Sequence, residues 1–103
     1  KIEIGIVTKL DTSENQVNTI YLGIGSNLGN RFSNIEKAKS FLLENDINII
    51  SISSYYETPS WPDPNNPKFI NIVLKVKTTL NSFKLLDLCK NIEVKFGEIF
   101  DPN

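Results

Sequence analysis

The segment Ile20–Arg31, which reads IYLGIGSNLGNR, most constrains the fold of this chain. Its first residues alternate, and Ile20, Leu22 and Ile24 form one apolar row that predicts a strand. The strand breaks into a loop rich in glycine and asparagine, and a helical pattern begins after Arg31. Such a turn gathers backbone N–H groups at a helix N-terminus, where anions are favoured. The loop is therefore either a phosphate cradle or an ordinary tight turn, for which Gly and Asn are the usual residues.

Two common phosphate-binding motifs are excluded for this loop. A Walker A loop closes with Lys followed by Ser or Thr, and no such pair follows here. The dinucleotide fingerprint spaces its glycines two and then three apart, whereas these stand at positions 23, 25 and 29. The function of the loop therefore has to be judged from the rest of the chain.

The composition is typical of one small soluble domain. The chain has 103 residues, 40% hydrophobic and 22% charged, with a net charge of −1. It lacks the basic field that indicates nucleic-acid binding, and no apolar run is long enough to span a membrane. With no signal peptide and one cysteine, Cys89, we expect a cytoplasmic protein without an internal disulfide. The absence of histidine excludes histidine metal sites and Ser-His or Cys-His catalysis.

The two ends suggest a fragment, because the sequence begins at Lys1 and stops at Asn103 just after a helical segment. Residues 1–19 are expected to lie apart from a domain at 20–103. Isoleucine at every second position from 2 to 6 predicts a short strand, and the polar stretch 11–19 is typical of a linker. That strand is either the tail of a preceding domain or an extra edge strand of this one.

Two helices and two further strands are predicted after the opening segment. Helical periodicity covers 31–45 and 82–96, and strand-like patterns cover 47–57 and 69–78. The two strands are expected to pair in antiparallel fashion, so that the order from residue 20 is β-α-β-β-α. One more strand would complete the split βαβ pattern. The predicted fold class is therefore α+β, a ferredoxin-like sandwich whose final strand or strands are missing.

The helix ends carry capping signals. Ser33 to Glu36 fits a capping box at the start of the first helix, and Asn30 is a second candidate. Ser82 is expected to cap the second helix, and Gly97 is expected to end it.

The strand at 69–78 separates its residues by face. Apolar residues at 70, 72, 74 and 76 must face the helices, whereas Phe69 and Asn71 share the opposite face. An aromatic ring beside a carboxamide suits a pterin- or purine-like heterocycle, because the ring packs and the amide offers a donor and an acceptor. The alternative is an asparagine that bonds only to a neighbouring loop.

The loop between the two strands holds four of the five prolines and begins Thr58-Pro59-Ser60-Trp61-Pro62. Its stiffness would let it bind a flat polar ligand at low entropic cost, and the alternative is a loop that only runs over the surface.

On the second helix, Lys90 and Glu93 have the pattern of ordinary exposed charges, and Cys89 has the pattern of a core residue.

Three motifs stand in one order, IGSNLGNR at 24–31, SSYYETPSW at 53–61 and FINIVLKV at 69–76. Together, over residues 20–100, they resemble the 6-hydroxymethyl-7,8-dihydropterin pyrophosphokinases of folate biosynthesis. The resemblance implies a cleft that holds the pterin and ATP with Mg²⁺. It also implies transfer of the pyrophosphoryl group to the hydroxymethyl oxygen, with release of AMP.

The same resemblance implies site residues by position. Those for the pterin are Thr58, Pro59, Trp61, Phe69 and Asn71, with Gly25, Ser26 and Asn27 in a largely structural loop beside them. Lys90 and Glu93 fall on the ATP side. Phe69 stands where a tyrosine is common in the family. On this basis the opening loop shapes the pterin side of the cleft, which weakens its interpretation as a phosphate cradle.

The resemblance also implies what this sequence lacks. Family members carry basic residues just after the helix, where this chain has Glu98-Ile99-Phe100, and further on two aspartates that bind magnesium. No catalytic or metal-binding residue is therefore assigned here, and this piece is expected to be inactive alone. The parent protein is expected to be fused to other folate-pathway domains, with a dihydroneopterin aldolase-like piece before residue 20.

Two alternatives stay open from the sequence. The chain could be a non-catalytic ferredoxin-like module for binding or assembly, since fold does not give function. It could also be a remnant that does not fold stably, because an incomplete sheet exposes a strand edge.

Overall fold

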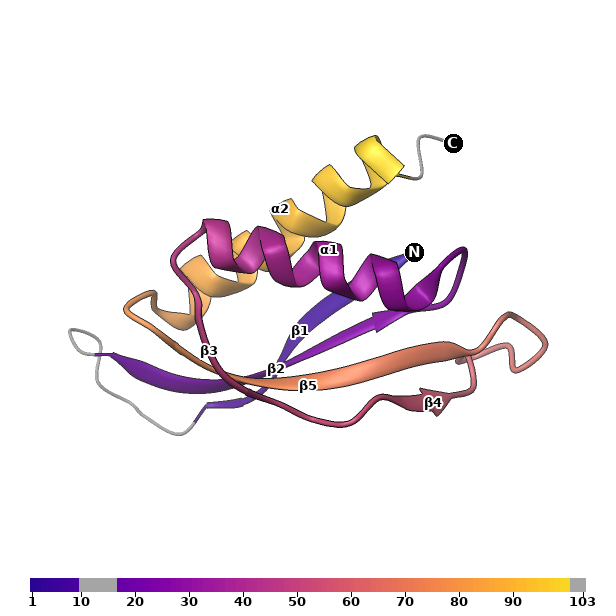
Figure 1. The fold of residues 1–103 in the computed structure, drawn as a ribbon, viewed down its shortest axis with the longest axis horizontal. Coiled ribbons are helices and arrows are strands. Elements are labelled where there is room, and N and C mark those ends of the chain that lie inside the picture. The colour runs from indigo at the N-terminus through magenta and orange to yellow at the C-terminus, as the bar shows by residue number, and fades with distance from the viewer. Residues whose placement is uncertain (10–16, 101–103) are drawn as a thin grey trace.

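The computed structural model describes residues 1–9 and 17–100, and every structural statement below concerns these residues. They form a five-stranded antiparallel sheet and two helices (Figure 1). The elements in chain order are β1 (Ile2–Lys9), β2 (Asn18–Ser26), α1 (Arg31–Glu44), β3 (Asn48–Ile52), β4 (Tyr56–Thr58), β5 (Phe69–Thr78) and α2 (Ser82–Phe100). The predicted α+β sandwich of the ferredoxin-like class is thereby confirmed.

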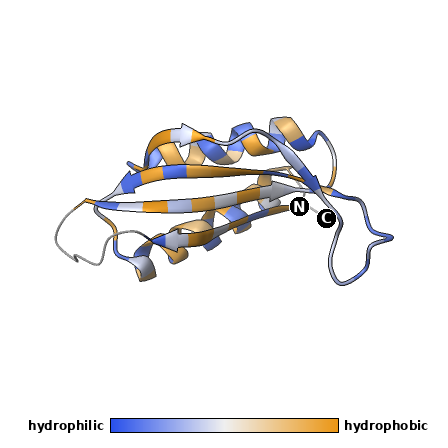
Figure 2. Ribbon diagram, turned by 90° about the horizontal axis from the view of Figure 1, so that it is seen from below, coloured by the Kyte–Doolittle hydropathy of each residue, from blue (hydrophilic) through white to orange (hydrophobic). Residues whose placement is uncertain are grey.

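The strand order is β1-β2-β5-β3, and β4 pairs with the first part of β5. Both helices cover one face of the sheet, and the other face is open (Figure 1). Apolar and polar residues alternate along the central strands, as Figure 2 shows from the open side. The apolar rows of β2 and β5 face each other in register, with Ile24 opposite Ile72 and Leu22 opposite Leu74. All four of these side chains are buried in the core beneath the helices.

The predicted strand 47–57 is interrupted, and this part of the prediction is wrong. It forms β3 and β4 with a break between them, where the Ser53 side chain replaces a backbone partner. Ser53 Oγ accepts a hydrogen bond from the Val73 N–H at 2.8 Å, and the Ser53 N–H donates to the Val73 carbonyl at 2.9 Å. A side chain that competes for a ladder hydrogen bond ends regular pairing at that point.

The residue that caps the N-terminus of each helix is an asparagine. Asn30 Oδ1 accepts from the Ser33 N–H at 3.1 Å, so the second candidate caps α1 rather than the Ser33 capping box. Asn81 Oδ1 accepts from the Lys84 N–H at 2.9 Å, so the cap of α2 lies one residue before Ser82. An asparagine in this place satisfies an otherwise unpaired N–H of the first helical turn.

Helix α2 also continues through Gly97, which was expected to end it, as far as Phe100, the last residue that the structure describes. The Phe100 ring packs on Phe96 with the ring centroids 4.8 Å apart, and Lys37 Nζ of α1 lies 4.1 Å from the Phe100 ring centroid. These contacts stabilise a last turn that the glycine alone disfavours.

Strand β1 pairs with β2 from Ile2 opposite Ser26 to Lys9 opposite Ile20 and so forms one edge of the sheet. The separate origin predicted for residues 1–19 stays a prediction, and most of the predicted linker lies outside the described residues. Neither helix in the described part of the chain has the length and apolar character needed to cross a membrane.

Candidate functional site

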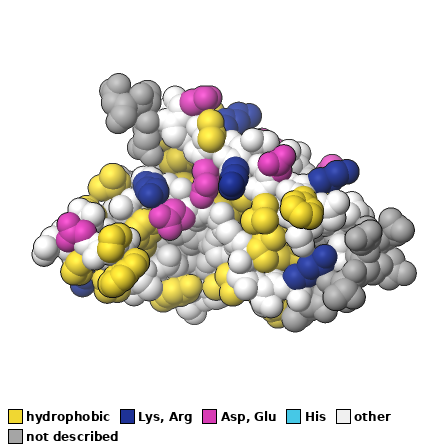
Figure 3. All heavy atoms as spheres, turned by 180° about the vertical axis from the view of Figure 1, so that it is seen from behind, with side chains coloured by type: hydrophobic (Ala, Val, Ile, Leu, Met, Phe, Trp, Pro, Cys, Tyr) yellow, Lys and Arg dark blue, Asp and Glu magenta, His cyan; other side chains and the backbone are white. Residues whose placement is uncertain are grey.

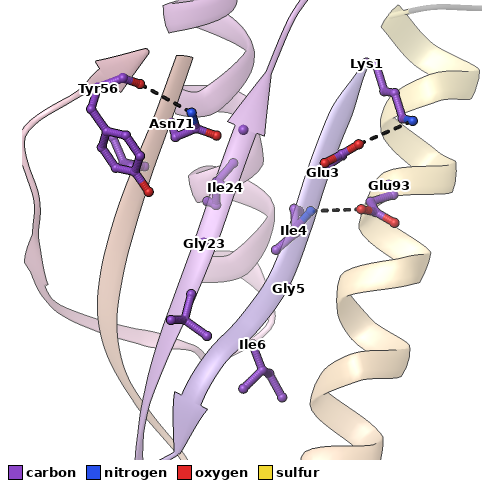
Figure 4. A pocket seen from close by; sticks show the side chains of 13 residues that line it. Lys1, Glu3, Ile4, Gly5, Ile6, Gly23, Ile24, Tyr56, Asn71 and Glu93 are labelled. Atoms are coloured by element: carbon purple, nitrogen blue, oxygen red, sulfur yellow. Dashed lines mark hydrogen bonds and ion pairs between the residues drawn. The ribbon is translucent and has the colours of Figure 1, made fainter. Parts of the chain in front are cut away.

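A cleft of about 570 Å³ lies at the end of the sheet where β2 gives way to α1. Its size falls within the usual range of small-molecule sites. Three glycines on the open face, Gly5 of β1 with Gly23 and Gly25 of β2, leave its floor without side chains. Figure 4 shows Tyr56 and Asn71 on one side of the cleft and Glu93 of α2 on the other.

Asn71 lies directly against Gly25 on the neighbouring strand, because the two are partners in the β2–β5 register. A Cβ on Gly25 would lie 2.6 Å from Asn71 Oδ1 and 3.2 Å from Phe69 Cδ2. The amide and the ring can therefore occupy these positions only because residue 25 has no side chain. The structure brings together three of the predicted site residues, from two strands, at this point.

The amide of Asn71 is held by the short strand β4. Its Nδ2 donates to Thr58 Oγ1 at 2.9 Å. The same Nδ2 donates to the Tyr56 carbonyl at 3.4 Å, as Figure 4 shows. Both amide hydrogens are thereby used within the protein, and the Oδ1 atom is left as the acceptor on the Gly25 side. Thr58 itself pairs with Phe69 across β4 and β5. Asn71 therefore presents an acceptor, where the sequence had suggested an acceptor together with a donor.

The proline loop is tied down at both ends. Ser60 is buried, and its Oγ donates to the Pro67 carbonyl. Arg31, at the start of α1, donates from Nη1 to Glu57 Oε2 and to the Lys68 carbonyl, each at 3.0 Å. One guanidinium thus joins the residues just before and just after the loop.

Within the loop, Pro59 and Trp61 lie beyond the anchored Thr58. Trp61 is 91% exposed, so the structure places its ring in solvent, and it does not line the cleft. The role of Trp61 in pterin binding stays a prediction.

The glycine and asparagine loop after β2 uses its polar groups internally. Ser26 is fully buried, and its Oγ accepts from Asn34 Nδ2 at 3.0 Å. The same Nδ2 donates to the Leu28 carbonyl at 2.9 Å, and Gly29 has φ +69°, which favours glycine. Asn27 Oδ1 is buried with no hydrogen-bond partner in the described residues. These contacts are those of a tight turn.

Helix α2 contributes Glu93 to the cleft, where its Oε2 accepts from the Ile4 N–H of β1 at 2.8 Å. Lys90 is exposed and is absent from the cleft lining, so the structure does not bring it to the other predicted residues.

Cys89 is buried in α2. Its burial is the larger cause, and the nearby Glu93 charge the smaller one, of a thiol pKa that is raised to about 11. A thiol of that kind is a poor nucleophile.

The described residues contain no group of three or more His, Cys, Asp or Glu side chains that could hold a metal ion. Phosphate-bound magnesium is usually held by carboxylates. The residues present around the cleft therefore do not fit a magnesium site by themselves.

Fold and cleft together define the class of this protein, a ferredoxin-like α+β sandwich with a small-molecule-sized cleft at one end of its sheet. Residues 21–101 match the family model described as 7,8-dihydro-6-hydroxymethylpterin-pyrophosphokinase (HPPK). The chain belongs to this family, and the resemblance in its three motifs is confirmed.

Similar proteins come from distant organisms. A 2-amino-4-hydroxy-6-hydroxymethyldihydropteridine pyrophosphokinase of Aquifex aeolicus is 44% identical over 79 residues, which are 77% of this chain and 49% of that protein. The protein of the same name in Bacillus subtilis is 33% identical over 78% of this chain and 48% of its own length. The folic acid synthesis protein fol1 of Schizosaccharomyces pombe is 34% identical over 88% of this chain but 12% of its own length.

This chain thus spans about half the length of the single-function relatives named here. Among solved structures, an unknown protein from Galdieria sulphuraria aligns with a TM-score of 0.52 at 14% identity, covering 91% of this chain and 50% of that one. That likeness supports the fold alone.

Several residues of the site were not found from the sequence. Gly5 and Gly23 form part of the floor, and Tyr56 stands at its side. Arg31 fixes the loop. The alternation in IYLGIG does place Gly23 and Gly25 on one face, so this part of the cleft floor could have been predicted from the sequence. The Arg31 contacts depend on tertiary structure and could not.

Proposed function

We propose that this chain forms the pterin-binding part of an enzyme of folate biosynthesis that transfers pyrophosphate from ATP, with Mg²⁺, to 6-hydroxymethyl-7,8-dihydropterin. Membership of the pyrophosphokinase family supports the reaction. The observation that carries the pterin assignment is the group formed by Gly25 and Asn71, which line the cleft, and the Phe69 ring, which lies against Gly25. A non-catalytic module is not favoured, because the named relatives are pyrophosphokinases.

In this proposal Asn71 Oδ1 accepts an N–H of the pterin, and the Phe69 ring packs against its flat face. Thr58 holds the amide in that orientation, since its hydroxyl accepts from Asn71 Nδ2 at 2.9 Å. Thr58, Pro59 and Trp61 contribute mainly backbone groups, which the stiff loop holds at low entropic cost. Gly25, Ser26 and Asn27 shape the wall beside the ring.

The nucleotide side is proposed to include Glu93 and Lys90 of α2. Pyrophosphoryl transfer needs metal or cationic stabilisation of phosphate charge, and the described residues contain no group of His, Cys, Asp or Glu side chains that could hold a metal ion. We therefore expect pterin binding without turnover by this chain. In the whole protein we expect a cytoplasmic enzyme. Fusion to other folate-pathway domains is supported by the fol1 relative, in which the matched region is 12% of the protein.

The test is calorimetry of 6-hydroxymethyl-7,8-dihydropterin in the presence of a non-hydrolysable ATP analogue and magnesium. We expect binding by the native chain and a loss of about 5- to 150-fold in affinity in Asn71→Ala, since each removed hydrogen bond to a buried partner costs about 1–3 kcal/mol. Lys75→Ala is the matched control, because Lys75 lies on the same face of β5 outside the cleft. Equal affinities of native chain and Asn71→Ala, or no binding at all, would contradict the assignment.

A further inference from the structure

Strand β1 adds a carboxylate to the cleft. Ile2 and Ile4 are 5% and 8% exposed and belong to the core, so Glu3 between them lies on the opposite, open face of the sheet, where it lines the cleft. β1 lies outside the family match at residues 21–101. Glu3 is therefore a cleft residue that the matched domain does not itself contain.

The strand register places Glu3 in one row with Asn71 across the open face. Glu3 is the partner of Gly25 across β1 and β2, and Gly25 is the partner of Asn71 across β2 and β5. Figure 4 shows Asn71 on one side of β2 and Glu3 on the other. Because neighbouring strands lie about 4.8 Å apart, the backbones at Glu3 and Asn71 are separated by roughly 10 Å, with only the bare glycine between them.

The Asn71 amide narrows this gap from its own side. A Cβ on Gly25 would lie 2.6 Å from Asn71 Oδ1, so this oxygen reaches over β2 toward β1. Both hydrogens of the amide are bonded to β4, which leaves Oδ1 as an acceptor. An ionised carboxylate is likewise an acceptor and donates nothing. The row therefore sets an acceptor on each side of Gly25, both within reach of one flat ligand.

Two contacts hold Glu3 in place and leave it able to bind. Glu93 Oε2 accepts from the Ile4 N–H at 2.8 Å, which fixes the backbone beside Glu3 against α2. Lys1 Nζ lies 3.3 Å from Glu3 Oε1, and both side chains are more than half exposed, so this ion pair is weak. A carboxylate has about four lone-pair sites on its two oxygens, so Glu3 can accept further hydrogen bonds.

Charge on the neighbouring surface does not select a ligand by itself. Figure 3 shows acidic and basic side chains mixed on the described part of the face seen from behind, and the net charge of the chain is −1. Attraction at long range needs a field of one sign. A preference of the cleft for hydrogen-bond donors must therefore come from close contacts, such as those that Asn71 and Glu3 can make.

From this row we propose that Glu3 is a second specificity residue of the cleft, which accepts an N–H of the ligand beside the one that Asn71 Oδ1 accepts. This role rests on the proposed function and adds a residue to the same site. The ligand that fits is a flat heterocycle with two neighbouring N–H donors on one edge, as the amino group and the ring N–H of a pterin provide. A ring with a carbonyl in place of the amino group is rejected, because its oxygen and the carboxylate are both acceptors.

The test compares 6-hydroxymethylpterin with 6-hydroxymethyllumazine, which carries a carbonyl in place of the amino group. Affinities are measured by calorimetry of the full chain with a non-hydrolysable ATP analogue and magnesium. We expect the native chain to prefer the pterin, and Glu3→Ala to lower the pterin-to-lumazine affinity ratio by about 3- to 10-fold, the range for a hydrogen bond to a partly exposed group. Glu3→Gln should bind the lumazine more tightly than the native chain does, because the Gln amide can donate to its carbonyl. Destabilisation of the fold cannot produce that gain.

Glu98→Gln is the matched control, because it removes the same charge from an exposed position of α2 outside the cleft and should keep the native ratio. If Asn71→Ala weakens pterin binding while the Glu3 variants keep the native ratio and the native lumazine affinity, the role of Glu3 is overturned and the proposed function stands. A native chain that binds the two ligands equally would also overturn the role of Glu3. A native chain that binds neither would overturn both proposals.

Discussion

Asn71 and Gly25 lie so close across β2 and β5 that a Cβ on the glycine would come within 2.6 Å of Asn71 Oδ1. The same Cβ would lie 3.2 Å from the Phe69 ring. The bare backbone of one strand thus forms the surface on which the two proposed pterin contacts of the next strand rest. The glycine of the opening motif and the asparagine of the third motif are parts of one packing arrangement.

Replacing Gly25 with alanine should therefore displace both neighbours. We expect Gly25→Ala to destabilise the fold by about 1–3 kcal/mol, the usual cost of overpacking, because the clash involves side chains that β4 holds in place. Pterin affinity should fall by about 5- to 150-fold through loss of the Asn71 orientation. Urea unfolding and calorimetry measure the two effects.

Gly5→Ala provides the matched control for this prediction. It is also a strand glycine on the cleft floor, but a Cβ there meets nothing within 4 Å. We expect its stability to stay the same or rise by up to about 1 kcal/mol, because alanine loses less backbone entropy than glycine. Equal destabilisation by the two changes would show that loss of glycine itself, rather than contact with Asn71, is responsible.

Arg31→Ala should loosen the proline loop with little effect on global stability. Arg31 joins Glu57 to the Lys68 carbonyl, but the Arg31 and Glu57 side chains are 29% and 44% exposed, so their ion pair contributes about 0–1 kcal/mol. Trp61 is the only tryptophan, so its fluorescence anisotropy reports on this loop alone. We expect lower anisotropy in Arg31→Ala and a melting temperature within a few degrees of the native chain.

Arg31→Lys is the matched variant for the loop. It keeps the charge near Glu57 but cannot make two hydrogen bonds with the same geometry, so its anisotropy should lie between the native and alanine values. Unchanged anisotropy in both variants would mean that the prolines alone hold the loop.

Much of the fold could be predicted from the sequence because its apolar rows are regular. The alternation in 20–24 and 70–76 gave the two central strands, and the helical stripes gave α1 and α2. The face division of β5 also placed Phe69 and Asn71 together on the side away from the helices, as the structure has them. These predictions depend on local periodicity, which tertiary contacts here reinforce.

The remaining features depend on contacts distant in sequence. The break between β3 and β4 comes from Ser53 bonding to Val73, and no local pattern distinguishes that serine from its neighbours. The direction of the Asn71 amide depends on Thr58, and β1 is held by its pairing with β2 and by the bond from the Ile4 N–H to Glu93. Continuation of α2 past Gly97 depends on ring contacts at Phe100. A single sequence carries no signal for such pairs.

Cys89 should react slowly with thiol reagents while the protein is folded. It is 1% exposed, and burial raises the pKa of its thiol to about 11, so the thiolate fraction at pH 8 is about one in a thousand. We expect labelling to follow unfolding, with rapid reaction in concentrated urea. Fast, complete labelling of the native chain would show that α2 opens readily.

The contact between α1 and the segment joining β3 to β4 should make stability depend on acid pH. Tyr55 Oη donates to Glu36 Oε1 at 3.0 Å, Lys39 Nζ donates to the same carboxylate at 2.9 Å, and the Tyr55 ring meets Phe32 edge-on with centroids 4.9 Å apart. The hydrogen bond from Lys39, followed by that from Tyr55, lowers the pKa of Glu36 below its ordinary value of 4.5.

A carboxyl group whose pKa is lower in the folded than in the unfolded state stabilises the fold fully at pH values above its unfolded-state pKa. This stabilisation is lost as the pH falls through the pKa of the folded state. The free energy of unfolding should therefore decline below pH 4.5, and Glu36→Gln should make the decline shallower. Glu44→Gln is the control, since Glu44 is an exposed glutamate at the other end of the same helix. Urea unfolding between pH 3 and pH 7 measures the difference, and identical slopes for the two variants would contradict the prediction.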